Sequence, residues 1–306
     1  MNPTQADAPA ARWNPQLQVG GGTSASPSIA FMQGGQGVIA WRGPGTDSRI
    51  FYVTQVDGER WSEQRQATGN TSHGPAVAAF GHNLFMAWKG VDADPRLFYA
   101  VSRDNGRTWS DQTQVGGSTS HSPALAVFNG RLYLAWKGGG DDQRLFYTST
   151  PDGGTWDGQR QAATEEAQSG DGPSLTVFQN QLYIGWSDPA GAAGTEWMYS
   201  SASPDGFNWR KPVRISIDGG SDQRPSITTS RNQLHAVWKG YAGDSGIYYS
   251  TSVDGIRWTP QERAVPDGGT SHAPSLADND HLWMVWKGVD SDERMFFSQG
   301  YFNPAG

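Results

Sequence analysis

The chain has 306 residues, a formal net charge of −7 and no cysteine. The acidic balance excludes a nucleic-acid surface as the main binding surface, because such surfaces need a concentrated basic field. The lack of cysteine excludes disulfides, thiolate zinc sites and cysteine nucleophiles.

The chain opens with residues 1–11, which we expect to form a flexible tail ahead of one domain at residues 12–306. The segment MNPTQADAPAAR has neither the basic start nor the apolar run of a secretory signal. No stretch of the sequence is apolar enough to cross a bilayer. We therefore expect a soluble protein that does not insert into membranes. The sequence leaves open whether it is secreted and whether it forms oligomers.

Six tryptophan-centred units follow one another along the chain. Their central residues are Trp41, Trp88, Trp136, Trp186, Trp238 and Trp286, spaced 47, 48, 50, 52 and 48 residues apart. A period of this size is typical of propellers and solenoids. Each unit contains four predicted short strands, which in the third unit are PALAVF, RLYLAWK, RLFYTST and QRQAA.

The strand pattern predicts the fold class. The first three strands of each unit are almost continuously apolar, as expected when both faces of a sheet are covered. Asn-Gly and Asp-Gly pairs mark the turns, and no segment has a sustained helical period. Radially arranged four-stranded units form a β-propeller. We therefore predict an all-β, six-bladed β-propeller of four-stranded antiparallel blades.

The sixth unit lacks a fourth strand, because the chain ends at MFFSQGYFNPAG, after the third strand. Residues 13–21, WNPQLQVGG, are similar to residues 109–117, WSDQTQVGG, which form the fourth strand of the second unit. We therefore predict that the N-terminal strand completes the sixth blade, which closes the ring and removes its open seam.

An acidic turn followed by tryptophan comes after the third strand in five units. The turns are TQVDGERW (54–61), SRDNGRTW (102–109), STPDGGTW (149–156), ASPDGFNW (202–209) and TSVDGIRW (251–258). The second matches the Asp-box, Ser-x-Asp-x-Gly-x-x-Trp, at every position, and the others place Asp directly before Gly. The chain thus resembles the sialidase-like Asp-box (BNR-repeat) β-propellers over almost its whole length. The resemblance implies structural turns that lie opposite the ligand-binding face.

The resemblance does not extend to a sialidase active site. Sialidases also carry an early Arg-Ile-Pro-type segment, an arginine triad, an acidic proton donor and a Tyr/Glu nucleophile pair. The nearest analogue of the first is QRPSI, with Arg224 and Ile227, which lacks the intervening residue and lies in the fifth unit. A catalytic centre breaks symmetry, whereas the polar residues here recur. The pattern favours a non-catalytic, lectin-like member, and we assign no catalytic residue.

Polar residues recur in two loops on the face opposite the Asp-box turns. The loop entering the first strand carries TSHGP, TSHSP and TSHAP. The loop joining the second and third strands carries WKGVDADPR, WKGGGDDQR and WKGVDSDER. Units two, three and six thus share a set of candidate ligand-binding residues. They are His73, Lys89, Asp94 and Arg96; His121, Lys137, Asp142 and Arg144; and His272, Lys287, Asp292 and Arg294.

The other three units depart from this set in different ways. Unit one has Ala25, Arg42 and Arg49; unit four has Asp171, Ser187 and Glu196; unit five has Gln223, Lys239 and Gly246. Residues that hold a fold together should be needed equally in every blade, so the unevenness favours a ligand role. A bracing role stays open, because the lysine and arginine could pair with the aspartates of their own loop.

The residue types in these loops suit a neutral sugar, since arginine and lysine donate hydrogen bonds and aspartate accepts them. We predict a carbohydrate-binding protein, a lectin whose several equivalent sites bind glycans or glycoconjugates with avidity. No cofactor is expected. No metal is expected either, because the histidines recur one per unit. Two alternatives are a sialidase-like glycoside hydrolase with a single central site and a protein-interaction propeller.

Overall fold

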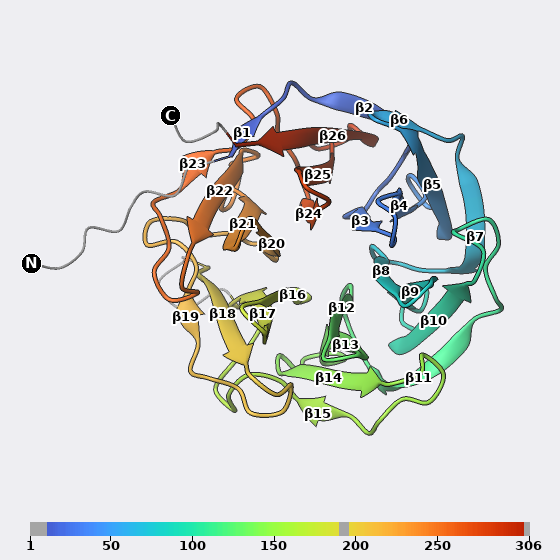
Figure 1. The fold of residues 1–306 in the computed structure, drawn as a ribbon, viewed down its shortest axis with the longest axis horizontal. Helices are drawn as coiled ribbons and strands as arrows, with labels where there is room; N and C mark the ends of the chain where they lie inside the picture. The colour runs from blue at the N-terminus through green and yellow to red at the C-terminus, as the bar shows by residue number, and fades with distance from the viewer. Residues whose placement is uncertain (1–10, 190–195, 303–306) are drawn as a thin grey trace, which may run out of the picture.

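Six antiparallel sheets surround a central axis in the computed structural model, which describes residues 11–189 and 196–302 (Figure 1). The first strand of each sheet lies nearest the axis. The predicted six-bladed β-propeller is therefore confirmed. Within the described residues, no helix is present that is long and apolar enough to cross a membrane.

Within each blade the strands follow chain order from the axis outward, except that the outer strands of blade six come from the N-terminus. Blade one contains β3 (Ser28–Phe31), β4 (Gly37–Arg42), β5 (Arg49–Asp57), β6 (Arg60–Trp61) and β7 (Arg65–Asn70). Blade two contains β8 (Ala76–Phe80), β9 (Asn83–Lys89), β10 (Arg96–Ser102) and β11 (Thr113–Ser118). Blade three contains β12 (Ala124–Phe128), β13 (Arg131–Lys137), β14 (Leu145–Thr150) and β15 (Arg160–Gln161).

The remaining blades repeat this order. Blade four contains β16 (Ser174–Phe178), β17 (Gln181–Ser187), β18 (Met198–Ser203) and β19 (Val213–Arg214). Blade five contains β20 (Ser226–Ser230), β21 (Gln233–Lys239), β22 (Ile247–Ser252) and β23 (Glu262–Arg263). Blade six contains β24 (Ser275–Asp278), β25 (Leu282–Lys287), β26 (Arg294–Tyr301), β1 (Arg12–Trp13) and β2 (Leu17–Gly22).

The N-terminal strands complete the sixth blade, as predicted. Both β1 and β2 pair antiparallel with β26, and Trp13 lies opposite Gly300 (Figure 1). The two ends of the chain are therefore held in one sheet. Of the predicted tail, residues 1–10 lie outside the described residues, and Ala11 is buried.

The core lies between neighbouring blades. The six repeated tryptophans, at the penultimate position of each second strand, are among the largest fully buried side chains. Trp88 of blade two, for example, shares an apolar cluster with Val38 and Tyr52 of blade one. Each sheet is thus covered on both faces, which explains why its strands are apolar at successive positions.

A glycine in the preceding blade allows Trp88 to pack closely. Gly69 in β7 has φ +82°, and a Cβ added there would lie 2.3 Å from the indole ring of Trp88. Any larger residue would clash with the ring and would also be strained by the left-handed backbone. This explains why a glycine occurs near the end of the fourth strand.

The turns after the third strands are held by their aspartates in four blades. Asp104 Oδ1 accepts backbone N–H groups of Arg107 at 3.1 Å and Thr108 at 2.9 Å, and equivalent bonds occur at Asp152, Asp205 and Asp254. Blade one differs from the pattern seen in the sequence. There β5 continues to Asp57, whose carboxylate forms an ion pair with Arg60.

A buried histidine lies beside the closing blade. His235 in β21 is fully buried, with Nδ1 at 2.7 Å from Tyr249 Oη and Nε2 at 3.1 Å from the Ser230 carbonyl. The carbonyl can only accept a hydrogen bond, so Nε2 carries the proton and Nδ1 accepts from the tyrosine hydroxyl. Burial lowers the pKa of His235 from 6.5 to about 4.

This pKa predicts a pH-dependent loss of stability. The unfolded chain takes up the proton first as the pH falls, because the pKa of His235 is lower in the folded state. The contribution of neutral His235 to the free energy of unfolding is complete above pH 6.5 and is lost towards pH 4, a change of roughly 3 kcal/mol. Denaturant titrations above pH 6.5 and near pH 4 measure this change. When the pH is lowered between them, the free energy of unfolding should fall less for His235→Gln than for the wild type. Exposed His82→Gln is the control, and an equal loss in His235→Gln contradicts the assignment.

Candidate functional site

The lysine of each WKG sequence ends a second strand and is buried beneath the loop that follows. Lys89 Nζ donates to Ser72 Oγ at 3.1 Å, to the Gly90 carbonyl at 3.3 Å and to the Asp92 carbonyl at 2.7 Å. Burial lowers its pKa. All three ammonium hydrogens are engaged, so Lys89 braces its loop and has no hydrogen free for a ligand.

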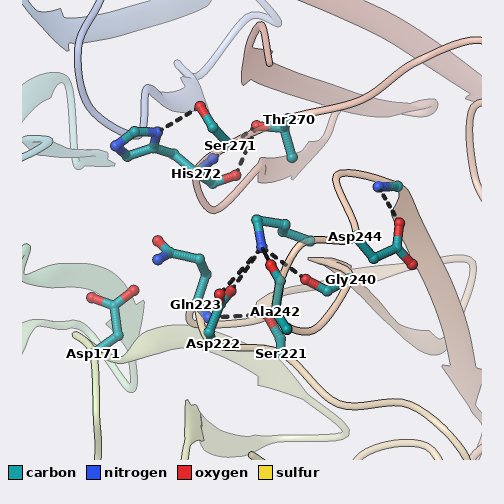
Figure 2. Close-up of polar contacts among 12 residues, drawn as sticks. Asp171, Ser221, Asp222, Gln223, Gly240, Ala242, Asp244, Thr270, Ser271 and His272 are labelled. Carbon is teal, nitrogen blue, oxygen red and sulfur yellow. Dashed lines mark hydrogen bonds and ion pairs between the residues drawn. The ribbon is translucent and has the colours of Figure 1, made fainter. Parts of the chain in front are cut away.

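The other lysines of this column are placed in the same way. Lys137 donates to Ser120, and Lys287 donates to Ser271 and to three carbonyls. In blade five the serine is replaced by Asp222, whose Oδ1 lies 2.9 Å from Lys239 Nζ (Figure 2). Each lysine of the column thus donates to the side chain at this serine position and to carbonyls of its own loop.

Replacement of Lys239 tests this bracing role. Lys239→Met would leave Asp222 without its counterion and the carbonyls of Gly240 and Ala242 without a donor. We expect a loss of roughly 2 kcal/mol in the free energy of unfolding, because Asp222 keeps some contact with water. Lys211→Met, at an exposed site, should have little effect in the same denaturant titration. Equal stability of the two variants would contradict the bracing role.

The aspartate and arginine of each complete set form an exposed ion pair. Arg96 Nη2 lies 2.7 Å from Asp94 Oδ2, and Arg96 Nε lies 2.8 Å from Asp94 Oδ1. The guanidinium lies over the ring of Phe98, 5.2 Å from its centroid. The arginine beside it lowers the pKa of Asp94 to about 2. Blades three and six repeat this arrangement with Asp142 and Arg144 and with Asp292 and Arg294.

Blade one contains a fourth ion pair of this kind, which is not among the residues predicted from the sequence. Asp47 and Arg49 of blade one form the same fork, with Nη2 to Oδ2 at 2.7 Å, over the ring of Phe51. The signal was the spacing Asp-x-Arg, which blade one shares with the other three. The four arginine side chains are 53–60% exposed. We call these four pairs, Asp47–Arg49, Asp94–Arg96, Asp142–Arg144 and Asp292–Arg294, the Asp–Arg forks.

The glycine after each lysine makes room for the fork. A Cβ added at Gly90 would lie 2.5 Å from Cγ of Asp94, so the carboxylate packs directly on the glycine. The Arg96 backbone N–H also donates to Asp94 Oδ1, at 3.0 Å. The Lys-Gly sequence and the Asp-x-Arg sequence are thus two parts of one loop structure.

The histidines are placed apart from the forks, at the axis of the ring. His73, His121 and His272 precede the first strands of their blades and line one cavity of about 280 Å³, which we call the axial pocket. The rings of His73 and His121 are 5.5 Å apart between centroids. Asp171, Asp222, Gln223 and Arg224 also line this pocket.

The structure therefore divides the four residues of each predicted set. Aspartate and arginine form a fork on the surface, the lysine is buried beneath the loop, and the histidine faces the axis. Lysine and histidine are linked only through a serine: Ser72 Oγ contacts both Lys89 Nζ and His73 Nδ1, at 3.1 Å each. This serine was not singled out from the sequence, although it forms part of every TSH motif.

A group of carboxylates lies near the axial pocket in blades four and five. Burial raises the pKa of Glu196, and the neighbouring carboxylates of Asp222, Asp188 and Asp171 raise it further. Asp171 accepts the backbone N–H groups of Gly172 at 2.6 Å and Arg224 at 3.0 Å. The axial pocket is therefore less symmetric than the ring of blades around it.

No family model and no curated protein matches this sequence. Solved structures do match the fold. The α-L-arabinanase of Penicillium chrysogenum complexed with arabinobiose is similar with a TM-score of 0.73 and 14% identity, over 96% of this chain and 99% of that chain. A protein of unknown function from Dyadobacter fermentans DSM 18053 is similar with a TM-score of 0.72 and 14% identity, over 97% and 100%.

Trypanosoma rangeli sialidase is a further structural neighbour. Its TM-score is 0.64 at 15% identity, over 96% of this chain and 60% of that chain. The chain thus has the propeller fold of a sialidase and of an arabinanase. At these identities, the likeness shows the fold alone.

Proposed function

We propose that this protein is a non-catalytic carbohydrate-binding protein, a lectin with equivalent glycan sites at its four Asp–Arg forks. The observation that carries the proposal is the repetition of one exposed fork on an aromatic ring in four blades, at the same end of each third strand. Such a repeat offers several equivalent contacts to a branched or surface-attached glycan.

The chemistry of the forks suits sugar hydroxyls. In each fork the aspartate binds Nε and Nη2 of the arginine, so the Nη1 group keeps its two hydrogens for a ligand oxygen. The carboxylate supplies a nearby acceptor. Because the ion pair and the phenylalanine hold the guanidinium in place, little further conformational entropy is lost on binding. Paired charges favour a neutral sugar over a charged one.

The structural neighbours support a carbohydrate ligand. The arabinanase structure contains arabinobiose, and the sialidase has been solved with the inhibitor DANA and with 2,3-difluorosialic acid. Binding to a fork also agrees with its small expected role in stability, since exposed ion pairs contribute roughly 0–1 kcal/mol. The lysines, in this proposal, hold the loops that carry the forks.

A glycan array combined with a turnover assay tests the proposal. The purified protein should bind a defined set of neutral glycans and should leave fluorogenic glycosides of those same sugars intact. The lectin proposal would be contradicted if the protein bound no glycan at all, or if free sugar did not compete with the glycan for binding.

One observation favours a second candidate, a glycoside hydrolase with a central site. Hydrolysis of a glycoside needs one protonated and one ionised carboxyl group, and Glu196, with its raised pKa, lies near Asp171 and Asp222. Turnover of a glycoside that is abolished by Glu196→Gln, with the melting temperature unchanged, would favour this candidate over the lectin.

A further inference from the structure

The axial pocket contains a buried cation without a partner. Arg224 is 8% exposed and lines both this pocket and a smaller cavity of about 80 Å³ between the first strands. Its backbone N–H donates to Asp171, but its guanidinium forms no hydrogen bond or ion pair among the described residues. A buried donor group of this kind needs a partner, so a ligand or solvent inside the pocket must accept from it.

Hydrogen-bond counting assigns the tautomer of the three pocket histidines. Ser72 Oγ has one proton, and the Gly90 carbonyl at 3.1 Å can only accept it. Lys89 Nζ donates to the same oxygen, which leaves one lone pair for His73 Nδ1 at 3.1 Å. Nδ1 therefore carries the proton of the imidazole, and Nε2 is an acceptor.

The same count holds at the other two histidines, through Ser120 with Lys137 and through Ser271 with Lys287. Burial lowers the pKa of all three, that of His73 to about 4, so they are neutral near pH 7. None of the three Nε2 atoms has a hydrogen-bond partner in residues 11–189 and 196–302. Figure 2 shows His272 with one ring nitrogen on Ser271 and the other unbonded.

The pocket thus offers three neutral acceptors at Nε2 and one cationic donor at Arg224, beside the carboxylates of Asp171 and of Asp222, which pairs with Lys239. The described residues contain no group of three ligands that could hold a metal ion, and Arg224 repels cations. Asp171 and the lone pairs on Nε2 repel an anion. A ligand must therefore donate several hydrogen bonds and accept others without carrying charge, which is the chemistry of vicinal hydroxyl groups. The volume, about 280 Å³, is at the small end for ligand pockets.

We propose that the axial pocket binds one neutral polyol the size of a monosaccharide, with hydroxyl groups donating to the three histidine Nε2 atoms and accepting from Arg224. This site is separate from the Asp–Arg forks and does not depend on them. It binds one ligand for each chain, whereas the forks bind several.

The test uses a variant in which Arg49, Arg96, Arg144 and Arg294 are all changed to Ala, so that only the axial pocket is intact. The probes are methyl α-D-mannoside, methyl β-D-galactoside, methyl α-L-fucoside and myo-inositol, with acetate and Zn²⁺ as charged probes. The readout is the ¹⁵N chemical shift of each histidine ring nitrogen. We expect at least one neutral probe to move the Nε2 resonances of His73, His121 and His272, but not those of exposed His82.

Three results would overturn the proposal. They are no response to any neutral probe, a response to acetate or Zn²⁺ alone, and protons on Nε2 in place of Nδ1. If this variant responds as expected while the wild type binds no glycan on an array, the forks fail as glycan sites and the axial site stands.

Two substitutions at one position provide a matched comparison. His121→Phe removes the Nε2 acceptor and should lower the affinity for the neutral probe at least tenfold. His121→Gln can place an amide oxygen near the position of Nε2 and should retain most of the affinity. Equal affinity of the two variants would contradict the proposed contact, and the melting temperatures of both report whether the fold is kept.

Discussion

Deletion of residues 1–21 is expected to destabilise the closed ring strongly. The deletion removes β1 and nearly all of β2, and so leaves β26 as an open edge strand. It also removes Trp13 and fully buried Val19, which pack in the apolar clusters on the two sides of blade six. The loss should be roughly 5 kcal/mol or more, comparable to the whole stability of many domains.

Thermal unfolding and size-exclusion chromatography measure this effect. The shortened chain should unfold at a much lower temperature and should associate through its open edge. A point substitution separates burial from chain length: Val19→Asp should be strongly destabilising, whereas Gln18→Asp, at the exposed neighbouring position, should not. A shortened chain with the melting temperature of the full chain would contradict closure by the N-terminal strands.

Replacement of all four fork arginines, Arg49, Arg96, Arg144 and Arg294, by Ala is expected to weaken binding to a glycan-coated surface strongly. Avidity raises the apparent affinity of linked sites by roughly 10²–10⁴, so loss of every fork should reduce surface binding at least a hundredfold. Single replacements should reduce it in steps. The melting temperature should change little, because each exposed pair contributes roughly 0–1 kcal/mol.

The control uses two arginines that follow the ends of third strands, whereas the fork arginines lie at their starts. Arg60 and Arg257 are also exposed and also form ion pairs with aspartates close in sequence, at Asp57 and Asp254. Their joint replacement by Ala should leave glycan binding unchanged in surface plasmon resonance. Parallel losses of binding and stability in the four-arginine variant would assign the forks to the scaffold.

The fold was predictable because its signals repeat. Six tryptophans at one spacing, nearly continuous apolar strands and the similarity of residues 13–21 to residues 109–117 each report local structure or covered sheet faces. These properties depend on the sequence of one unit and its neighbour. The turn of blade one was less predictable, since the extension of β5 to Asp57 depends on pairing with β6.

The candidate site was predictable in composition but not in arrangement. His73, Lys89 and Arg96 lie in the same two loops, so the sequence groups them. Their side chains point to the axis, into the loop and to the surface, respectively, and these directions depend on how a strand ends within the ring. Arg224 lies outside the repeated columns, and its lack of a partner is visible only in three dimensions.

The central claim, several equivalent glycan sites, is tested most directly by counting bound ligands. Native mass spectrometry with a monovalent glycan chosen from the array should show up to four more ligands on the wild-type chain than on the four-arginine variant. Each single arginine replacement should remove one. Equal ligand counts for the wild type and the four-arginine variant would contradict the claim.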